Sequence, residues 1–141
     1  MKKIYLAGRV TGLTPEQANE WRVEFTGKVS GYFECINPLR NQINWFEKNT
    51  IISKEDKKNR PMSRRSIIKR DMQDIQKCDI LVANGDAGRG TTMEIFYAGY
   101  VLHIPVFVFN CEKHSIWIDE FTTQFFKDID ELAAFLIKYW S

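Results

Sequence analysis

The sequence predicts a single α/β domain, residues 1–141, built on a parallel β-sheet, and three observations support this prediction. Short apolar runs, several of them bounded by glycine or proline, are typical of buried strands. Longer segments with apolar residues at helical spacing separate these runs. The chain is also long enough to bury a hydrophobic core of its own. Because strands and helices alternate, crossover connections must join the strands, and such connections make the strands parallel.

Five segments are predicted strands, and they cover residues 3–7, 32–37, 79–83, 106–109 and 122–126. The first helix begins at Thr14-Pro15, a cap followed by a proline that favours the first helical position, and it ends at Gly31. Five alternations of strand and helix predict a three-layer, flavodoxin-like (Rossmann-like) fold with the sheet order 2-1-3-4-5.

Three further helices are predicted. One covers residues 66–77, one is capped by Thr91 or Thr92, and one begins at the cap Asp128. Their expected inward residues are Ile67, Ile68, Met72 and Ile75, then Met93, Ile95, Phe96, Ala98, Val101 and Leu102, then Leu132, Phe135 and Leu136. Residues 110–120 are a predicted loop, and residues 39–63 have no clear pattern.

The composition excludes several classes of protein. A net charge of +2 gives no general attraction to nucleic acid or to an anionic membrane. We find neither a transmembrane run nor a signal peptide in the sequence. The three cysteines are odd in number and far apart, which is typical of free, buried thiols in a cytoplasmic protein rather than of a disulfide framework or a zinc site.

Residues 79–109 form the central unit of the prediction: a strand, a glycine-rich turn, a helix and a second strand. Glu94 is expected in the first helical turn, just beyond the carboxyl end of a strand, which is where open α/β sheets bind ligands. The turn glycines Gly85, Gly88 and Gly90 do not have the spacing of a P-loop or of a dinucleotide fingerprint. The alternative interpretation is structural, because Thr91 and Glu94 also match a capping box.

The predicted topology brings further polar residues to the same edge of the sheet. In the order 2-1-3-4-5, two segments emerge side by side at the carboxyl ends of the strands: Gly8-Arg9 and residues 84–86, the last of which is Asp86. Glu94 is expected next to them. Asp71 and Asp74 share a helix face, and solvated charges are the simpler explanation for each of them. A basic cluster, usually a solvated face and alternatively a phosphate site, comprises Arg60, Arg64, Arg65, Lys69 and Arg70.

Four blocks of sequence carry a family resemblance: residues 3–8 (KIYLAG), 70–75 (RDMQDI), 78–83 (CDILVA) and 90–98 (GTTMEIFYA). In this order, and followed by Pro105-Val106, they resemble the nucleoside 2-deoxyribosyltransferase family, including its relatives that hydrolyse nucleoside monophosphates. The resemblance implies that Glu94 attacks the anomeric carbon of the sugar and forms a glycosyl ester. It implies that Asp71 lies near the base and that Tyr5 orients Glu94.

The resemblance also implies a small-molecule nucleoside or nucleotide ligand, no metal and no cofactor. The expected substrate-binding residues are Gly8, Arg9, Asp86, Gly88, Gly90 and Ser115. The family often completes each site with a loop of a neighbouring subunit, so a homo-oligomer is expected, with His114-Ser115 as the candidate loop. Three possibilities stay open: a transferase between bases, a hydrolase of 5′-monophosphates whose phosphate meets Arg9, Ser63 or Arg64-Arg65, and a non-catalytic nucleotide-sensing domain.

Overall fold

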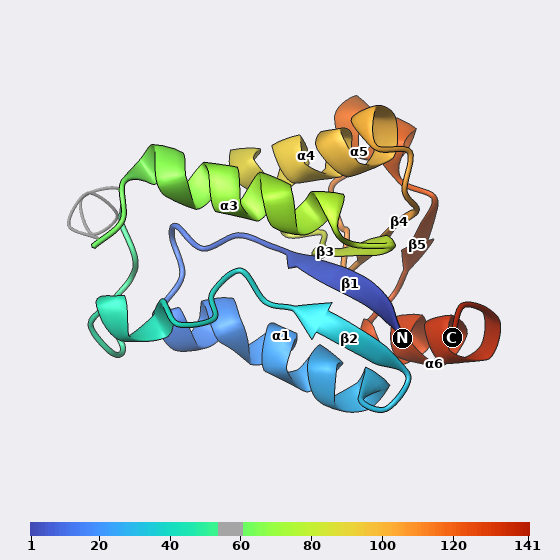
Figure 1. Cartoon of the computed structure of the whole chain (residues 1–141), viewed down its shortest axis with the longest axis horizontal. Coiled ribbons are helices and arrows are strands. Elements are labelled where there is room, and N and C mark those ends of the chain that lie inside the picture. The colour runs from blue at the N-terminus through green and yellow to red at the C-terminus, as the bar shows by residue number, and fades with distance from the viewer. Residues whose placement is uncertain (54–60) are drawn as a thin grey trace.

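The computed structural model describes residues 1–53 and 61–141, and it has an α/β fold with one five-stranded sheet (Figure 1). The strands are β1 (Lys2–Ala7), β2 (Phe33–Ile36), β3 (Ile80–Asn84), β4 (Val106–Phe109) and β5 (Gln124–Phe126). The α-helices are α1 (Pro15–Val29), α3 (Arg64–Gln76), α4 (Arg89–Phe96), α5 (Ile116–Phe121) and α6 (Ile129–Tyr139). A 3-10 turn, η1 (Ile43–Trp45), and a π-helical turn, η2 (Tyr97–Val101), complete the described elements.

All strand pairs are parallel, and the order is β2-β1-β3-β4-β5, which confirms the predicted topology. β1 pairs with β2 on one side and with β3 on the other. The chain leaves β1 toward one edge of the sheet and later leaves β3 toward the opposite edge. In folds of this order ligands bind at the carboxyl ends of these two strands, and we call the region around the loops after β1 and β3 the crevice.

Two helical layers cover the two faces of the sheet. α1 and α6 lie on one face, and α3, α4 and α5 lie on the other (Figure 1). Because side chains alternate along a strand, β1 contributes Ile4 and Leu6 to the core under α1, and Tyr5 and Ala7 to the core under α4. This alternation directs the Tyr5 side chain toward the helices that carry the acidic candidates.

The helix starts follow local capping signals. Thr14 caps α1, as predicted, and it also forms a capping box with Gln17. Ser63 caps α3, so that helix starts two residues before the predicted residue 66. Asp128 caps α6, as predicted.

Other expectations about the helices are wrong. Residues 110–120 are not all loop, because α5 begins at Ile116. Three residues expected to point inward are largely exposed: Ile68 at 60%, Met93 at 63% and Val101 at 49%. Val101 lies in the π-helical turn that follows α4, which changes the helical register from the one used in the prediction.

Within residues 1–53 and 61–141, no helix is long and apolar enough to cross a membrane. The same residues contain no group of three or more His, Cys, Asp or Glu side chains placed to hold a metal ion. All three cysteines are free, and of these Cys78 is buried while Cys35 and Cys111 are only partly so.

Candidate active site

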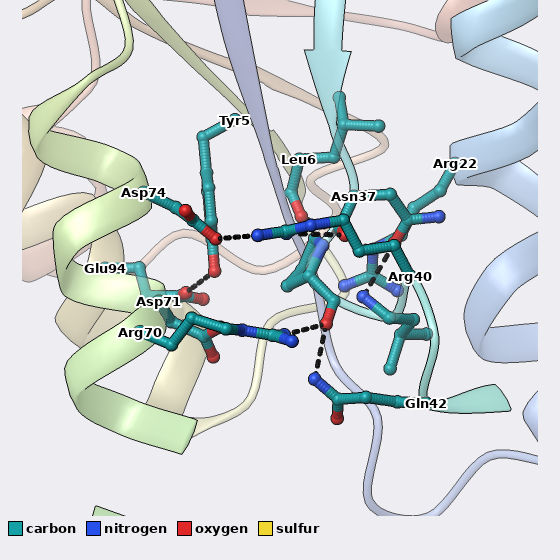
Figure 2. Close-up of polar contacts among 12 residues, drawn as sticks. Tyr5, Leu6, Arg22, Asn37, Arg40, Gln42, Arg70, Asp71, Asp74 and Glu94 are labelled. Carbon is teal, nitrogen blue, oxygen red and sulfur yellow. Dashed lines mark hydrogen bonds and ion pairs between the residues drawn. The ribbon is translucent and has the colours of Figure 1, made fainter. Parts of the chain in front are cut away.

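Tyr5 and Glu94 are in direct contact at the carboxyl end of the sheet. The Tyr5 side chain is fully buried, and its hydroxyl donates a hydrogen bond to Glu94 Oε2 at 2.5 Å (Figure 2). Burial, followed by the nearby charges of Glu94 and Asp71, raises the pKa of Tyr5 well above its ordinary value. The hydroxyl is therefore a protonated donor at neutral pH, aimed at one oxygen of the carboxylate.

Glu94 does not cap its helix, so the structural interpretation of this residue is wrong. α4 begins at Arg89, and the N-cap position is occupied by Gly88 rather than by Thr91 or Thr92. Glu94 is consequently the sixth residue of α4, in the second turn and not in the first. At that depth its carboxylate faces the sheet and Tyr5, beyond the reach of the helix start.

The environment of Glu94 favours its neutral form. Burial raises the pKa of Glu94 from 4.5 to about 7, the negative charge of Asp71 acts in the same direction, and the Tyr5 hydrogen bond and the charge of Arg22 oppose the rise. A carboxyl with a pKa near neutrality holds a proton reversibly under physiological conditions. Such perturbed groups in a crevice are typical of functional sites.

Asp71 lies on α3 beside Glu94 (Figure 2). It is partly buried, and its Oδ1 accepts a hydrogen bond of 3.4 Å from Arg70 Nη2. Burial raises the pKa of Asp71 from 3.8 to about 6, although the adjacent Arg70 lowers it. The site thus contains two neighbouring carboxyls, both shifted toward neutral pH.

Two arginines connect α3 with the segment that follows β2. Arg40 Nη2 donates to Asp74 Oδ2 at 2.7 Å, and Arg70 Nη2 donates to the carbonyl of Pro38 at 2.5 Å (Figure 2). Asp74 is therefore a buried ion-pair partner rather than a solvated charge, with 7% exposure. These contacts fix the helix that carries Asp71 against the neighbouring loop.

Arg9 and Asp86 form an ion pair across the crevice, with Nη2 and Oδ2 2.8 Å apart. Arg9 follows β1 and Asp86 follows β3, so their contact confirms that the two loops emerge side by side. A Cβ atom at Gly88 would lie 3.7 Å from Cγ of Arg9, which places this glycine against the arginine side chain. Gly8 contacts Trp21 and Arg22, because a Cβ there would lie 2.8 Å from the Trp21 ring.

The remaining candidates have distinct surroundings. Gly85 is required for packing, because an added Cβ would lie 2.5 Å from Cα of Cys111. Gly90 faces open space, with nothing within 4 Å of such an atom. Ser115 caps α5, its hydroxyl accepting the N–H of Ile118 at 3.2 Å. Arg60 of the basic cluster lies outside the described residues.

Sequence reasoning missed Arg22 and Arg40. Arg22 is 1% exposed, although it lies in the middle of an otherwise regular amphipathic helix, and Arg40 lies in the segment without a pattern. One signal was available for Arg22, since it stands next to Trp21 and within one turn of Phe25, on the inward side of α1.

Comparison with protein-family models gave no match, and neither did comparison with curated proteins. Solved structures are similar over nearly the whole chain. A 2-deoxyribosyltransferase from Leishmania mexicana is 15% identical, with 100% of each chain covered and a TM-score of 0.68. A 2-deoxyribosyltransferase from Bacillus psychrosaccharolyticus is 22% identical, with 93% of this chain and 90% of that chain covered and a TM-score of 0.65.

A CMP N-glycosidase from Clostridium botulinum is 17% identical, with 98% of this chain and 99% of that chain covered and a TM-score of 0.62. Similarity at these identities establishes the fold. The chain therefore has the fold of the 2-deoxyribosyltransferases, as the sequence resemblance predicted.

Proposed function

We propose that this protein cleaves the N-glycosidic bond of a (deoxy)nucleoside or its 5′-monophosphate through a covalent sugar ester on Glu94. The sugar then passes to another base or to water. The observation that carries the proposal is the 2.5 Å hydrogen bond between Tyr5 and Glu94, with Asp71 beside it. Further support comes from the fold, which is shared with two 2-deoxyribosyltransferases and a CMP N-glycosidase.

In the first step, the ionised Glu94 attacks the anomeric carbon of the sugar. A C–O bond forms, the C–N bond to the base breaks, and its electron pair stays on the base. Protonated Asp71 gives its proton to the departing base, which leaves as a neutral molecule. In the second step, water or a second base attacks the same carbon, gives its proton to Asp71, and releases the Glu94 carboxylate.

Both carboxyls can exchange the proton that this scheme requires, because both have pKa values close to neutral pH. With pKa values raised to about 7 for Glu94 and about 6 for Asp71, they titrate as a pair near neutral pH. These pKa values place a single proton mainly on Glu94, so the reactive form, with Glu94 ionised and the proton on Asp71, is the minor form before a ligand binds. A bound base favours that form, since its nitrogen accepts a hydrogen bond from protonated Asp71, while Tyr5 holds the carboxylate of Glu94 by one oxygen.

The sugar and its 5′ group occupy the crevice between the loops after β1 and β3 in this proposal. Gly8, Gly88 and Gly90 bring main-chain atoms close to the ligand, and Arg9 and Asp86 supply charge at its entrance. An Arg guanidinium suits phosphate oxygens, which favours a monophosphate, provided that the ligand replaces Asp86 as the partner of Arg9. Ser115 is proposed to act from the loop before α5 of a neighbouring subunit.

We further propose a homo-oligomer, because α4, the π-helical turn η2 and α5 expose large apolar side chains on their outer surface. Its exposed residues are Met93, Tyr100, Val101, Ile116 and Trp117. The occupant we propose is a second copy of the chain. α3 carries exposed Arg64, Arg65 and Lys69, and α5 carries exposed Asp119 and Glu120, so a two-fold axis along α4 would place the basic helix against the acidic one.

Sedimentation velocity tests this interface. Trp117→Glu should shift the protein to monomers, whereas Val23→Glu, an equally exposed position on α1 in the opposite layer, should leave its mass unchanged. A monomeric wild-type protein at micromolar concentration would contradict the interface.

The decisive experiment for the activity combines substrates with one variant. The protein is incubated with deoxynucleosides and deoxynucleoside monophosphates, with and without a second free base, and products are separated by chromatography. The products show directly whether the protein transfers the sugar, hydrolyses the bond or does neither. We expect the reaction to belong to cytoplasmic nucleotide salvage. Glu94→Gln should abolish turnover, because a neutral amide cannot form the ester. Wild-type rates in this variant would reject Glu94 as the nucleophile, whereas binding of a nucleotide without any turnover by the wild-type protein would favour the non-catalytic, nucleotide-sensing alternative.

A further inference from the structure

Arg22 is a buried cation at the end of the strand that carries Tyr5. Its side chain, on α1, is 1% exposed and lies over the Trp21 ring at 4.9 Å from the ring centroid. A buried guanidinium is costly to hold unless its donors and its charge are both compensated.

The donors of Arg22 bond to main-chain carbonyls. Nε donates to Leu6 O at 3.3 Å, Nη2 donates to Gly8 O at 2.9 Å, and Nη1 donates to Ala18 O. Leu6 and Gly8 flank Ala7, the last residue of β1, so one side chain fixes the backbone where the strand turns into the crevice loop. Figure 2 shows Arg22 beside Leu6, across β1 from Glu94.

Its charge is compensated at longer range by the acids of the site. Burial lowers the pKa of Arg22 to about 10, and Glu94, Tyr5 and Asp71 each oppose this change. The effect is mutual, because the charge of Arg22 opposes the rise in the pKa of Glu94. The groups that act on Glu94 come from three surrounding elements: Tyr5 of β1, Asp71 of α3 and Arg22 of α1.

We propose that Arg22 is a positioning residue of the active site, which fixes the turn after Tyr5 through its carbonyl contacts and supplies the buried positive charge that keeps Glu94 available as a carboxylate. Arg22 contacts neither sugar nor base and acts through Glu94 and the Gly8 turn. This inference rests on the proposed glycosyl chemistry, which gives the ionised form of Glu94 its importance.

Two substitutions separate the two roles. Arg22→Lys keeps the charge but cannot span three carbonyls, so kcat should fall about tenfold or more, while the acid limb of the pH profile of kcat/KM stays in place. Arg22→Met removes the charge, so the pKa of Glu94 should rise and the acid limb should move to higher pH by about half a pH unit or more.

The matched control is Lys28→Gln on the same helix. Lys28 forms a surface ion pair with Asp130 at 2.5 Å and lies outside the candidate site. This variant should leave both kcat and the pH profile unchanged. Circular dichroism and cooperative urea unfolding establish that each variant is folded.

A readout that needs no turnover separates this inference from the proposed function. The carboxyl carbon of Glu94 is followed by ¹³C NMR from pH 4 to 9, with Glu94→Gln assigning the resonance. An upward shift of the titration in Arg22→Met supports the electrostatic role even if no substrate is turned over, and in that case only the proposed function fails. If Arg22→Met does not fold, Arg22→Lys decides through kcat. Folded Arg22 variants with wild-type kcat and a wild-type Glu94 titration would overturn the proposal.

Discussion

Glu94→Gln should separate catalysis from stability, because the carboxylate that the proposed chemistry needs is partly buried and has a raised pKa. Burial raises the pKa of Glu94 from 4.5 to about 7 in the folded protein, so the folded state holds this proton more tightly than the unfolded chain. The resulting stabilisation is fully present below about pH 4.5 and is lost as the pH rises through 7. A pKa change of this size corresponds to about 3 kcal/mol at most.

Glutamine has the shape of glutamate and keeps an oxygen that accepts the Tyr5 hydrogen bond, but it carries no charge at any of these pH values. Relative to wild type, Glu94→Gln should therefore become more stable between pH 4.5 and pH 8, by up to about 3 kcal/mol. Turnover should be lost over the whole range. A capping role would have given the opposite sign at pH 8, since replacing a charged cap weakens the helix start.

The assay is urea unfolding at pH 4.5, 6 and 8, followed by the fluorescence of the four tryptophans. Glu20→Gln, at an exposed position of α1, is the matched control and should change stability by less than about 0.5 kcal/mol at each pH. If the difference between Glu94→Gln and wild type were the same at pH 4.5 and at pH 8, the desolvation argument for Glu94 would be refuted.

Three further predictions concern Tyr5, Asp71 and the ion pair between Arg9 and Asp86. Tyr5→Phe removes a hydrogen bond that lowers the pKa of Glu94. The acid limb of the pH profile of kcat/KM should therefore move to higher pH, and kcat should fall about tenfold or more. An unchanged pH profile would contradict this role of the Tyr5 hydrogen bond. Asp71→Asn should slow turnover of natural nucleosides at least about 100-fold, but it should leave turnover of a substrate whose leaving group needs no proton nearly unchanged. Equal losses of turnover on both substrates would reject Asp71 as the proton donor. In low-salt calorimetry, Arg9→Met should weaken binding of a monophosphate more than binding of the nucleoside, and Asp86→Asn should strengthen binding of the monophosphate. Equal affinities of the wild-type protein for both ligands would exclude a phosphate contact.

The order of the sheet could be predicted because it depends on short-range patterns. The predicted strand 106–109 has the same first and last residues as β4. Thr14-Pro15 marks the start of α1 through contacts that lie within one helical turn. The parallel order then follows from the alternation of strand and helix, without knowledge of any side-chain contact.

The start of α4 could not be predicted in the same way. Thr91 and Glu94 match a capping box, but Gly88 occupies the N-cap position, and Thr91 is buried at 3% exposure inside the first turn. Two starts three residues apart satisfy the local signals equally well. The contact of Glu94 with Tyr5, 89 residues away in the sequence, is made in the observed arrangement, and no local pattern contains it.

The ion pair between Arg40 and Asp74 was missed for a related reason, since it joins a patternless segment to a helix 34 residues later. Arg22 is a different case. Its partners are main-chain carbonyls, which every residue possesses, so the sequence carries no complementary side chain that would indicate the contact. Long-range polar contacts of this kind require the fold before they can be inferred.

The reversal of strand order explains why the acids and Arg22 lie on opposite faces of β1. α1 takes the chain from β1 toward β2, whereas α3 and α4 precede and follow β3 as the chain moves toward the other edge. Right-handed crossovers that run in opposite directions must lie on opposite faces of the sheet. Glu94 and Asp71 therefore approach Tyr5 from one face, and Arg22 reaches the end of the same strand from the other. A cation placed in this way can stabilise a carboxylate without occupying the space that a substrate needs, because the strand itself stands between Arg22 and the crevice.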